Sequence, residues 1–170
     1  MSNNKNYKLK KTQVTFVPAR CFSPHVKKTL RTCWYEVFLL CKEKGAKAAC
    51  VDIYVVSDTK IKNINQKYRG IDKVTDVISL DFGVEPNGTK SGIIYLAKGV
   101  ISRVAKKMLH TIEDEIVFLS VHGMLHICGY DHEKKQEEQE MLKAMKIVLE
   151  NVPQYAPLLA TYKRHSLIDY

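Results

Sequence analysis

The stretch Ile116-Val-Phe-Leu-Ser-Val-His-Gly-Met-Leu-His-Ile-Cys128 decides the fold. It is apolar on nearly every face, which is typical of a buried helix. Glu113, Asp114 and Glu115 precede it, where the dipole at the start of a helix favours acidic residues. Gly129 follows, and glycine readily adopts the left-handed conformation that ends many helices. We therefore expect a buried helix here, against which the other elements pack.

Patterns on both sides of this helix predict further strands and helices. Alternating or β-branched stretches predict strands at 13–17, 49–55, 74–82 and 93–97. Apolar residues at helical spacing predict helices over 24–44, 58–69, 100–109 and 133–149. Strands mixed with segregated helices indicate an α+β fold.

Length and composition predict one globular domain. The chain has 170 residues, of which 45% are hydrophobic and 26% charged, and neither a repeat nor a Pro/Gly/Ser-rich linker divides it. This composition excludes disorder and low complexity for most of the chain. We expect a single domain over 1–170, with a polar, basic N-terminal tail (1–11), an α+β core (12–150) and a partly irregular, partly mobile C-terminal tail (151–170).

Three sequence features favour a cytoplasmic location. No apolar run reaches the ~18 residues of a transmembrane helix, so no membrane partner is expected. The polar, basic start of the chain lacks the apolar stretch of a secretory signal. The five cysteines are odd in number and contain no C-x-x-C pair, which favours reduced thiols.

The basic residues are concentrated in the first two thirds of the chain. The formal net charge is +9, and residues 1–50 contribute 11 Lys or Arg against 2 acids. Residues 51–110 add 10 against 6, whereas residues 111–150 carry 4 against 9. A basic surface attracts a polyanion such as nucleic acid. The alternative is that these lysines lie on solvated helix faces and only keep the protein soluble.

The string His122-Gly-Met-Leu-His126-Ile-Cys-Gly129-Tyr-Asp-His132 carries the chemistry. Residues four apart lie on one face of a helix, so the imidazoles of His122 and His126 can converge on one point. Gly129 lets the chain turn back, which brings His132 toward the same point. Three neutral histidines with one open position are the composition of a catalytic zinc site, where zinc lowers the pKa of bound water to about 7. We therefore expect one Zn²⁺ per chain.

Two other interpretations of this string stay open. The histidines can be hydrogen-bonded core residues, although an unpaired imidazole in an otherwise apolar helix is costly. The spacing also matches the zinc protease signature H-E-x-x-H-x-x-G-x-x-H, in which the glutamate activates water. Gly123 occupies the position of that glutamate, so the protease base is absent and a zincin-like metalloprotease is disfavoured.

The histidine string resembles the signature of the YbeY family, bacterial metal-dependent endoribonucleases linked to ribosomal RNA maturation. Upstream, Asn65-Gln-Lys-Tyr-Arg69-Gly70 and Thr75-Asp-Val-Ile-Ser79 resemble the family's N-x-x-Y-R-x and T-D-V-L-S-F segments, and the resemblance covers roughly residues 45–150. It implies an α+β fold in which a small mixed sheet packs with helices and a zincin-like helix carries a three-histidine zinc site. Carried over by position, the metal ligands are His122, His126 and His132, and the catalytic residues are Arg69 and His122.

The resemblance also implies a substrate and a partner. The substrate is single-stranded RNA, and the partner is the small ribosomal subunit with its ribosomal RNA, whereas DNA is not expected. The implied roles are processing of the 3′ end of 16S ribosomal RNA and ribosome quality control. Arg69 suits a phosphodiester because its planar guanidinium can bind two phosphate oxygens. The alternative is a surface arginine at a helix-ending turn.

One position departs from the family pattern, and a few roles stay open. The family's Gly-Asp-Ile is Gly92-Ile-Ile94 here, so the usual carboxylate is missing at Ile93 and its role is in doubt.

Asp131 either orients a ligand histidine or begins the next helix. Cys128 is expected in the core. Three polar residues either line a cleft or only mark a strand edge: Thr75, Asp76 and Ser79. The remaining histidines have no spacing that suggests chemistry: His25, His110 and His165.

Functions from different classes follow from these observations. The first is a zinc-dependent endoribonuclease. The second is a non-catalytic ribosome-assembly or RNA-binding factor with a structural metal, and a third is a hydrolase of another phosphodiester or amide. The sequence leaves open which bond is cut, which metal is used, which partner recruits the protein and how many chains assemble.

Overall fold

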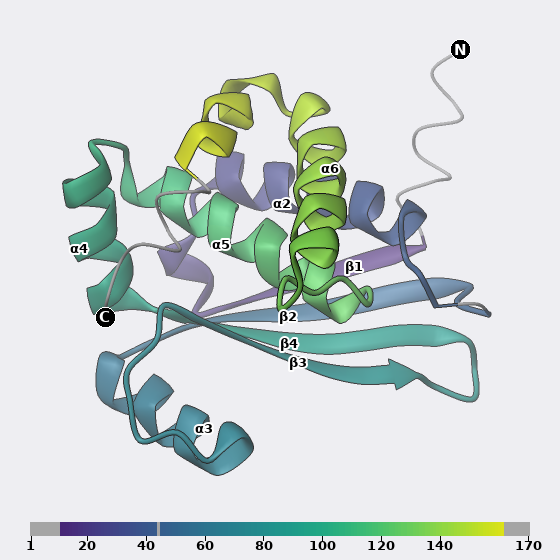
Figure 1. Ribbon diagram of the computed structural model, residues 1–170, viewed down its shortest axis with the longest axis horizontal. Coiled ribbons are helices and arrows are strands. Elements are labelled where there is room, and N and C mark those ends of the chain that lie inside the picture. The colour runs from purple at the N-terminus through teal and green to yellow at the C-terminus, as the bar shows by residue number, and fades with distance from the viewer. Residues whose placement is uncertain (1–10, 44, 162–170) are drawn as a thin grey trace.

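The computed structural model describes residues 11–43 and 45–161, shown in Figure 1. The strands are β1 (Thr12–Val17), β2 (Ala48–Val56), β3 (Val77–Val84) and β4 (Thr89–Ala97). The α-helices are α2 (Pro24–Leu39), α3 (Asp58–Arg69), α4 (Lys98–Met108), α5 (Ile112–Ile127) and α6 (Lys135–Glu150). Short 3-10 helices follow β1 and α6: η1 (Ala19–Cys21) and η2 (Pro153–Thr161).

The strands form one mixed sheet in the order β1-β2-β4-β3. β1, β2 and β4 run parallel, and β3 pairs antiparallel with β4. In Figure 1, α2, α5 and α6 lie on one side of the sheet and α3 lies on the other. The predicted α+β fold with a small mixed sheet is therefore confirmed.

Two clusters of buried side chains hold these layers together. The larger cluster lies between the sheet and the helices α2, α5 and α6, with Trp34 and Ile94 fully buried in it. The smaller cluster joins α3 and α4 to the other face of the sheet through Ile61 and Ile78. In α5, every residue from Glu115 to Val121 is buried, which confirms that this is the central helix.

The C-terminal end of α2 differs from the prediction because a distant segment intervenes. Ser23 caps its start as expected, since the Ser23 hydroxyl accepts the N–H of Val26. The helix ends at Leu39, earlier than predicted. The next residues turn toward the end of α5, where the carbonyl of Leu40 accepts the hydroxyl of Tyr130 at 3.1 Å. Helical spacing along α2 carries no information about that tertiary contact.

Two strand boundaries also differ from the prediction. β4 begins at Thr89, because its pairing with β2 already starts where Ala48 faces Thr89. β3 begins only at Val77, whose N–H donates to a carboxylate oxygen of Asp76 at 2.7 Å. The Thr75 hydroxyl donates to the same oxygen, so these two side chains shape the turn before the strand.

The structure describes only the first part of the predicted C-terminal tail. Residues 153–161 form η2, a regular element that the sequence pattern did not predict. The reason is burial: Val152, Tyr155 and Leu158 insert into the larger cluster, and each is at most 6% exposed. Residues 162–170, and residues 1–10 of the basic N-terminal tail, lie outside the described residues. Among the described helices, none is long and apolar enough to cross a membrane.

α5 packs closely against the sheet at Gly92 of β4. A Cβ atom at Gly92 would lie 2.7 Å from Cδ1 of Ile127 and 2.8 Å from the carbonyl oxygen of Leu80. The Ile127 side chain can turn aside, but the Leu80 carbonyl belongs to the neighbouring strand and cannot move alone. The absence of a side chain at Gly92 therefore sets the distance between the helix and the sheet.

Replacing Gly92 with alanine is expected to lower the free energy of unfolding by about 1–3 kcal/mol, because an overpacked contact shifts the backbone. Urea unfolding followed by circular dichroism measures the change. Ser91→Ala is the control, since Ser91 is also buried but points to the opposite face of the same strand. Unchanged unfolding midpoints for Gly92→Ala would contradict this account of the packing.

Candidate metal centre

The C-terminal end of α5 is closed by a tight, fully bonded turn. Gly129 adopts a φ of 84°, in the left-handed region that glycine tolerates. Its N–H donates to the carbonyl of His126 at 3.0 Å, and the N–H of Tyr130 donates to the carbonyl of Leu125 at 3.1 Å. This pair of hydrogen bonds defines a Schellman motif, which reverses the chain after a helix. The reversal places His132 next to the last turn of α5.

The three predicted histidines converge, as expected. One ring nitrogen from each of His122, His126 and His132 lies within 4.8 Å of the other two. The ring centroids are 4.7 Å apart for His122 and His126, 5.3 Å for His122 and His132, and 5.0 Å for His126 and His132. In the described part of the chain, no fourth histidine, cysteine or carboxylate joins this group.

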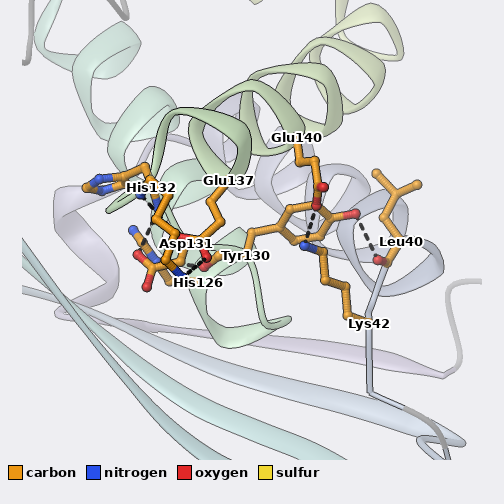
Figure 2. Close-up of polar contacts among 9 residues, drawn as sticks. Leu40, Lys42, His126, Tyr130, Asp131, His132, Glu137 and Glu140 are labelled. Atoms are coloured by element: carbon orange, nitrogen blue, oxygen red, sulfur yellow. Dashed lines mark hydrogen bonds and ion pairs between the residues drawn. The ribbon is translucent and has the colours of Figure 1, made fainter.

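The His126 ring is fixed by the turn that follows α5. Its Nδ1 lies 2.9 Å from the carbonyl oxygen of Tyr130, as Figure 2 shows. Because a carbonyl oxygen only accepts hydrogen bonds, Nδ1 carries the proton. The unprotonated nitrogen of the neutral ring, which can bind a metal ion, is therefore Nε2. A backbone carbonyl on the far nitrogen is the usual way in which proteins orient a metal-binding histidine.

The donor atoms fit one divalent ion. Nε2 of His126 lies 3.1 Å from Nε2 of His122. Two nitrogens bound to one tetrahedral zinc at about 2.0–2.1 Å would be separated by about 3.3 Å, so little movement is needed. Burial, followed by the charge of His132, lowers the pKa of His126 and keeps its ring neutral, which is the state that binds metal.

The centre is buried on one side and open on the other. His122 and His126 are half-buried on α5, whereas His132 is exposed. Three neutral nitrogen donors that face solvent leave room for a water or a substrate oxygen as a further ligand. A closed structural zinc site instead has four protein ligands. The three histidines could therefore hold an ion that keeps one coordination position open to solvent.

Asp131 acts on the backbone of the turn. Its carboxylate accepts the N–H of His132 at 2.8 Å and so holds the chain at that residue. It does not begin the next helix, because α6 starts at Lys135 and the N–H of Lys134 is bonded to Glu137 instead. The group that orients the His126 ring is the Tyr130 carbonyl, which residue types alone could not reveal.

Gly123 faces the sheet, and this explains why no protease base occurs there. A Cβ atom at Gly123 would lie 2.7 Å from the hydroxyl oxygen of Ser79 and 3.1 Å from Cδ1 of Ile94. A glutamate side chain has no space between α5 and the sheet. Ser79 is accordingly a packing neighbour of α5, and Cys128 is fully buried in the core as expected.

Ile93 lies away from the centre. It sits in the middle of β4, paired with Asp52 of β2 and Leu80 of β3. Its neighbour Ile94 packs toward α5, and successive residues of a strand point to opposite faces. The side chain at position 93 therefore points away from α5, the helix that carries His122 and His126.

Arg69 is the last residue of α3, and its side chain is exposed. α3 begins with a cap from Ser57 and ends at Gly70, as predicted. The positive charge of Arg69 contributes to the lowered pKa of His126, although less than burial and His132 do. Its guanidinium is thus within electrostatic reach of the histidines, on a different element.

Sequence patterns missed two clusters of ionisable side chains that include buried residues. His110 lies 2.6 Å from the buried Glu115 at the start of α5. Lys90, fully buried on β4, is bonded to Glu43 at 2.5 Å and to Asp81 at 2.7 Å. An isolated lysine in a strand gives no signal of burial, because its partners come from other segments.

Comparison with known proteins identifies the family. A family model described as Endoribonuclease YbeY matches residues 22–153. The chain belongs to the YbeY family. The matched range runs from the start of α2 into η2 and contains the three histidines and Arg69.

Individual relatives agree with this match. "Endoribonuclease YbeY" of a Nitratiruptor species is 34% identical over 113 residues, covering 66% of this chain and 77% of the relative. The protein of that name from Aquifex aeolicus is also 34% identical and covers 66% and 74%. A solution structure of a Thermotoga maritima protein shares the fold, with a TM-score of 0.50 and 23% identity over 84% of this chain and 91% of that one.

We predict that the YbeY signature holds one metal ion per chain. His126→Ala is expected to reduce bound zinc from about one ion per chain to almost none after dialysis against buffered zinc, because two imidazoles bind far more weakly than three. His25→Ala is the control, since His25 is exposed on α2 and stacks on Tyr155. Elemental analysis of the folded variants measures the metal, and full zinc occupancy in His126→Ala would exclude this centre.

Proposed function

We propose that this protein is a zinc-dependent endoribonuclease that cuts single-stranded RNA in the cytoplasm during ribosomal RNA maturation. The observation that supports this most strongly is the convergence of three imidazole donors on one exposed point. Membership of a family whose members are named endoribonucleases supplies the substrate class. The small ribosomal subunit and its ribosomal RNA are the proposed partners, with the 3′ end of 16S ribosomal RNA as the site of processing.

The proposed chemistry uses two parts of the chain: α5 with the turn that follows it, and the end of α3. His122, His126 and His132 would hold the ion, which would supply a water of lowered pKa or polarise a phosphoryl oxygen. The Tyr130 carbonyl keeps the His126 ring in the binding tautomer. Arg69 binds the oxygens of the scissile phosphodiester and neutralises the charge that increases during attack. His122 would be both a metal ligand and a catalytic residue, because it would lie beside the reacting phosphate.

The surface around Arg69 suits a nucleic acid. Lys67, Arg69 and Lys73 are all exposed at the end of α3 and in the loop after it. Tyr68 is 51% exposed in the same segment, and the Lys67 ammonium lies 4.9 Å from the centre of its ring. Basic side chains with an exposed aromatic ring are typical of surfaces that bind single strands, through phosphate contacts and base stacking.

The second candidate, a ribosome-assembly factor with a structural metal, has less support. A structural metal usually stabilises chain segments that do not fold without it. Both ends of α5 are closed by protein groups: Thr111 and Asp114 form a capping box at its start, and Gly129 and Tyr130 complete the turn at its end. The helix therefore does not need a metal to satisfy its backbone.

Arg69→Ala is expected to lower the rate of cleavage of a single-stranded RNA by about 100-fold at saturating RNA, with a change in binding of only a few fold, because one arginine is a small part of the binding surface. Arg103→Ala is the control, since Arg103 is exposed on α4 and paired with Asp58 at 3.0 Å. Gel-based cleavage and filter binding, with zinc content measured in parallel, give both quantities.

The same assay separates the two candidates. The nuclease requires that cleavage disappears with the metal in His126→Ala. Cleavage that survives metal loss would reject the proposed chemistry. Steep salt-dependent RNA binding without any metal-linked turnover would favour the assembly factor.

A further inference from the structure

The side chain of Tyr130 lies at the centre of a group of contacts beside the three histidines (Figure 2). Its hydroxyl donates to the carbonyl of Leu40 at 3.1 Å, in the segment that follows α2. The ammonium of Lys42 lies 4.4 Å from the centre of the Tyr130 ring and is bonded to Glu140 of α6 at 2.8 Å. Parts of the chain that are distant in the sequence therefore meet on this one side chain.

The backbone next to Tyr130 is joined to the same segment. The N–H of Lys42 donates to the carbonyl of Cys128, the C-cap residue of α5, at 3.1 Å. The segment after α2 is thus bonded to the end of α5 at Cys128 and again at Tyr130. Neither segment can shift along the other without breaking one of these hydrogen bonds.

The contacts of the Tyr130 side chain affect a carbonyl that the turn itself does not fix. The two hydrogen bonds of the turn are donated by the N–H groups of Gly129 and Tyr130, which precede the Tyr130 Cα atom. The Tyr130 carbonyl follows that atom, so its direction depends on the ψ angle of Tyr130. The chain is held again after it, where the Asp131 carboxylate accepts the N–H of His132. The anchored side chain and the Asp131 contact therefore determine together where this carbonyl points.

We propose that Tyr130 is a positioning residue, whose hydroxyl bond to Leu40 raises the affinity of the three histidines for a metal ion. The bond holds the Tyr130 carbonyl 2.9 Å from Nδ1 of His126, so the proton stays on Nδ1 and Nε2 is ready to bind metal. Without it, part of the protein takes the other tautomer, in which Nε2 carries the proton. The apparent affinity then falls with the fraction of rings in the binding tautomer.

The hydroxyl bond is expected to contribute more than the contacts of Lys42. Lys42 and Glu140 are largely exposed, and exposed ion pairs and cation–π contacts contribute little. Tyr130→Phe removes the hydroxyl bond but keeps the ring, its packing against the larger cluster and its contact with Lys42. This substitution therefore isolates the hydroxyl. The proposal rests on the metal centre but not on RNA cleavage, so the nuclease assay and the measurements below can fail independently.

Nitrogen NMR of the histidine rings tests the proposal on metal-free protein. At about pH 8 the rings are neutral, and the nitrogen shifts of His126 report which nitrogen carries the proton. We expect the Nδ1–H form in the wild-type protein and a detectable share of the Nε2–H form in Tyr130→Phe. Tyr155→Phe, at a buried tyrosine of η2, is the control and should keep the wild-type ratio. An unchanged ratio in Tyr130→Phe would overturn the proposal, since a purely structural role would not alter the tautomer.

Zinc affinity provides a second measurement. Competition with a chelator is expected to show about tenfold weaker binding in Tyr130→Phe, because removing a group that supports a ligand histidine typically weakens metal binding by tenfold or more. Tyr155→Phe should bind zinc as tightly as the wild-type protein. Circular dichroism verifies that both variants are folded. Equal affinities for Tyr130→Phe and the wild-type protein would contradict the proposal.

Hydrogen exchange in the wild-type protein tests the same coupling without any substitution. Coupling between two sites is reciprocal, so zinc binding should also hold the segment after α2 more firmly. We expect zinc to slow exchange of the Lys42 N–H, which donates to Cys128, severalfold more than exchange of the Gly99 N–H, which donates to Asp58 of α3. Equal slowing at both amides would show that the segment is not coupled to the metal centre and would reject the proposal.

Discussion

The arrangement of the three histidines depends on the turn that ends α5. Gly129 in the left-handed conformation lets the chain reverse, and the two hydrogen bonds of the turn fix where it goes. His126 stands before this turn and His132 follows it, while the Tyr130 carbonyl within it orients the His126 ring. A single local motif therefore brings together His126, His132 and the group that selects the tautomer of the His126 ring.

A precise turn is useful only if the helix before it cannot move. Most of α5 from Glu115 onward is buried between α2, α6 and the sheet, and Gly92 and Gly123 let it approach the strands closely. The segment after α2 contacts the end of α5 and the sheet. The Leu40 carbonyl accepts a hydrogen bond from the Tyr130 hydroxyl, and Glu43 forms an ion pair with the buried Lys90 of β4. Packing of apolar surface thus fixes the helix, and a few polar contacts fix its end.

Local chemistry explains how much of this could be predicted from the sequence. The start of α2, the extent of α3 and the burial of α5 follow from Ser23, Gly70 and an apolar run, which act within one or two turns of the chain. The convergence of the histidines follows from helical spacing and one glycine. The end of α2 and the fold of residues 153–161 could not be predicted, because they depend on contacts with residues far away in the sequence. The same holds for Lys90, whose burial depends on Glu43 and Asp81.

The division of the ligands between a rigid helix and an exposed turn has a chemical consequence. His122 and His126 are positioned before any ion binds, so the entropy of ordering them is already lost on folding. His132 is exposed and held through its backbone by Asp131, so its ring stays close to the other two while one side of the centre faces solvent. An ion held in this way keeps a face that a phosphodiester can reach, and the exposed Arg69 comes from another element, so it can contact the substrate without occupying a ligand position. Under the proposed function, the histidines on and just after α5 would hold the ion and Arg69 at the end of α3 would contact the RNA, so metal binding and substrate binding would use different parts of the chain.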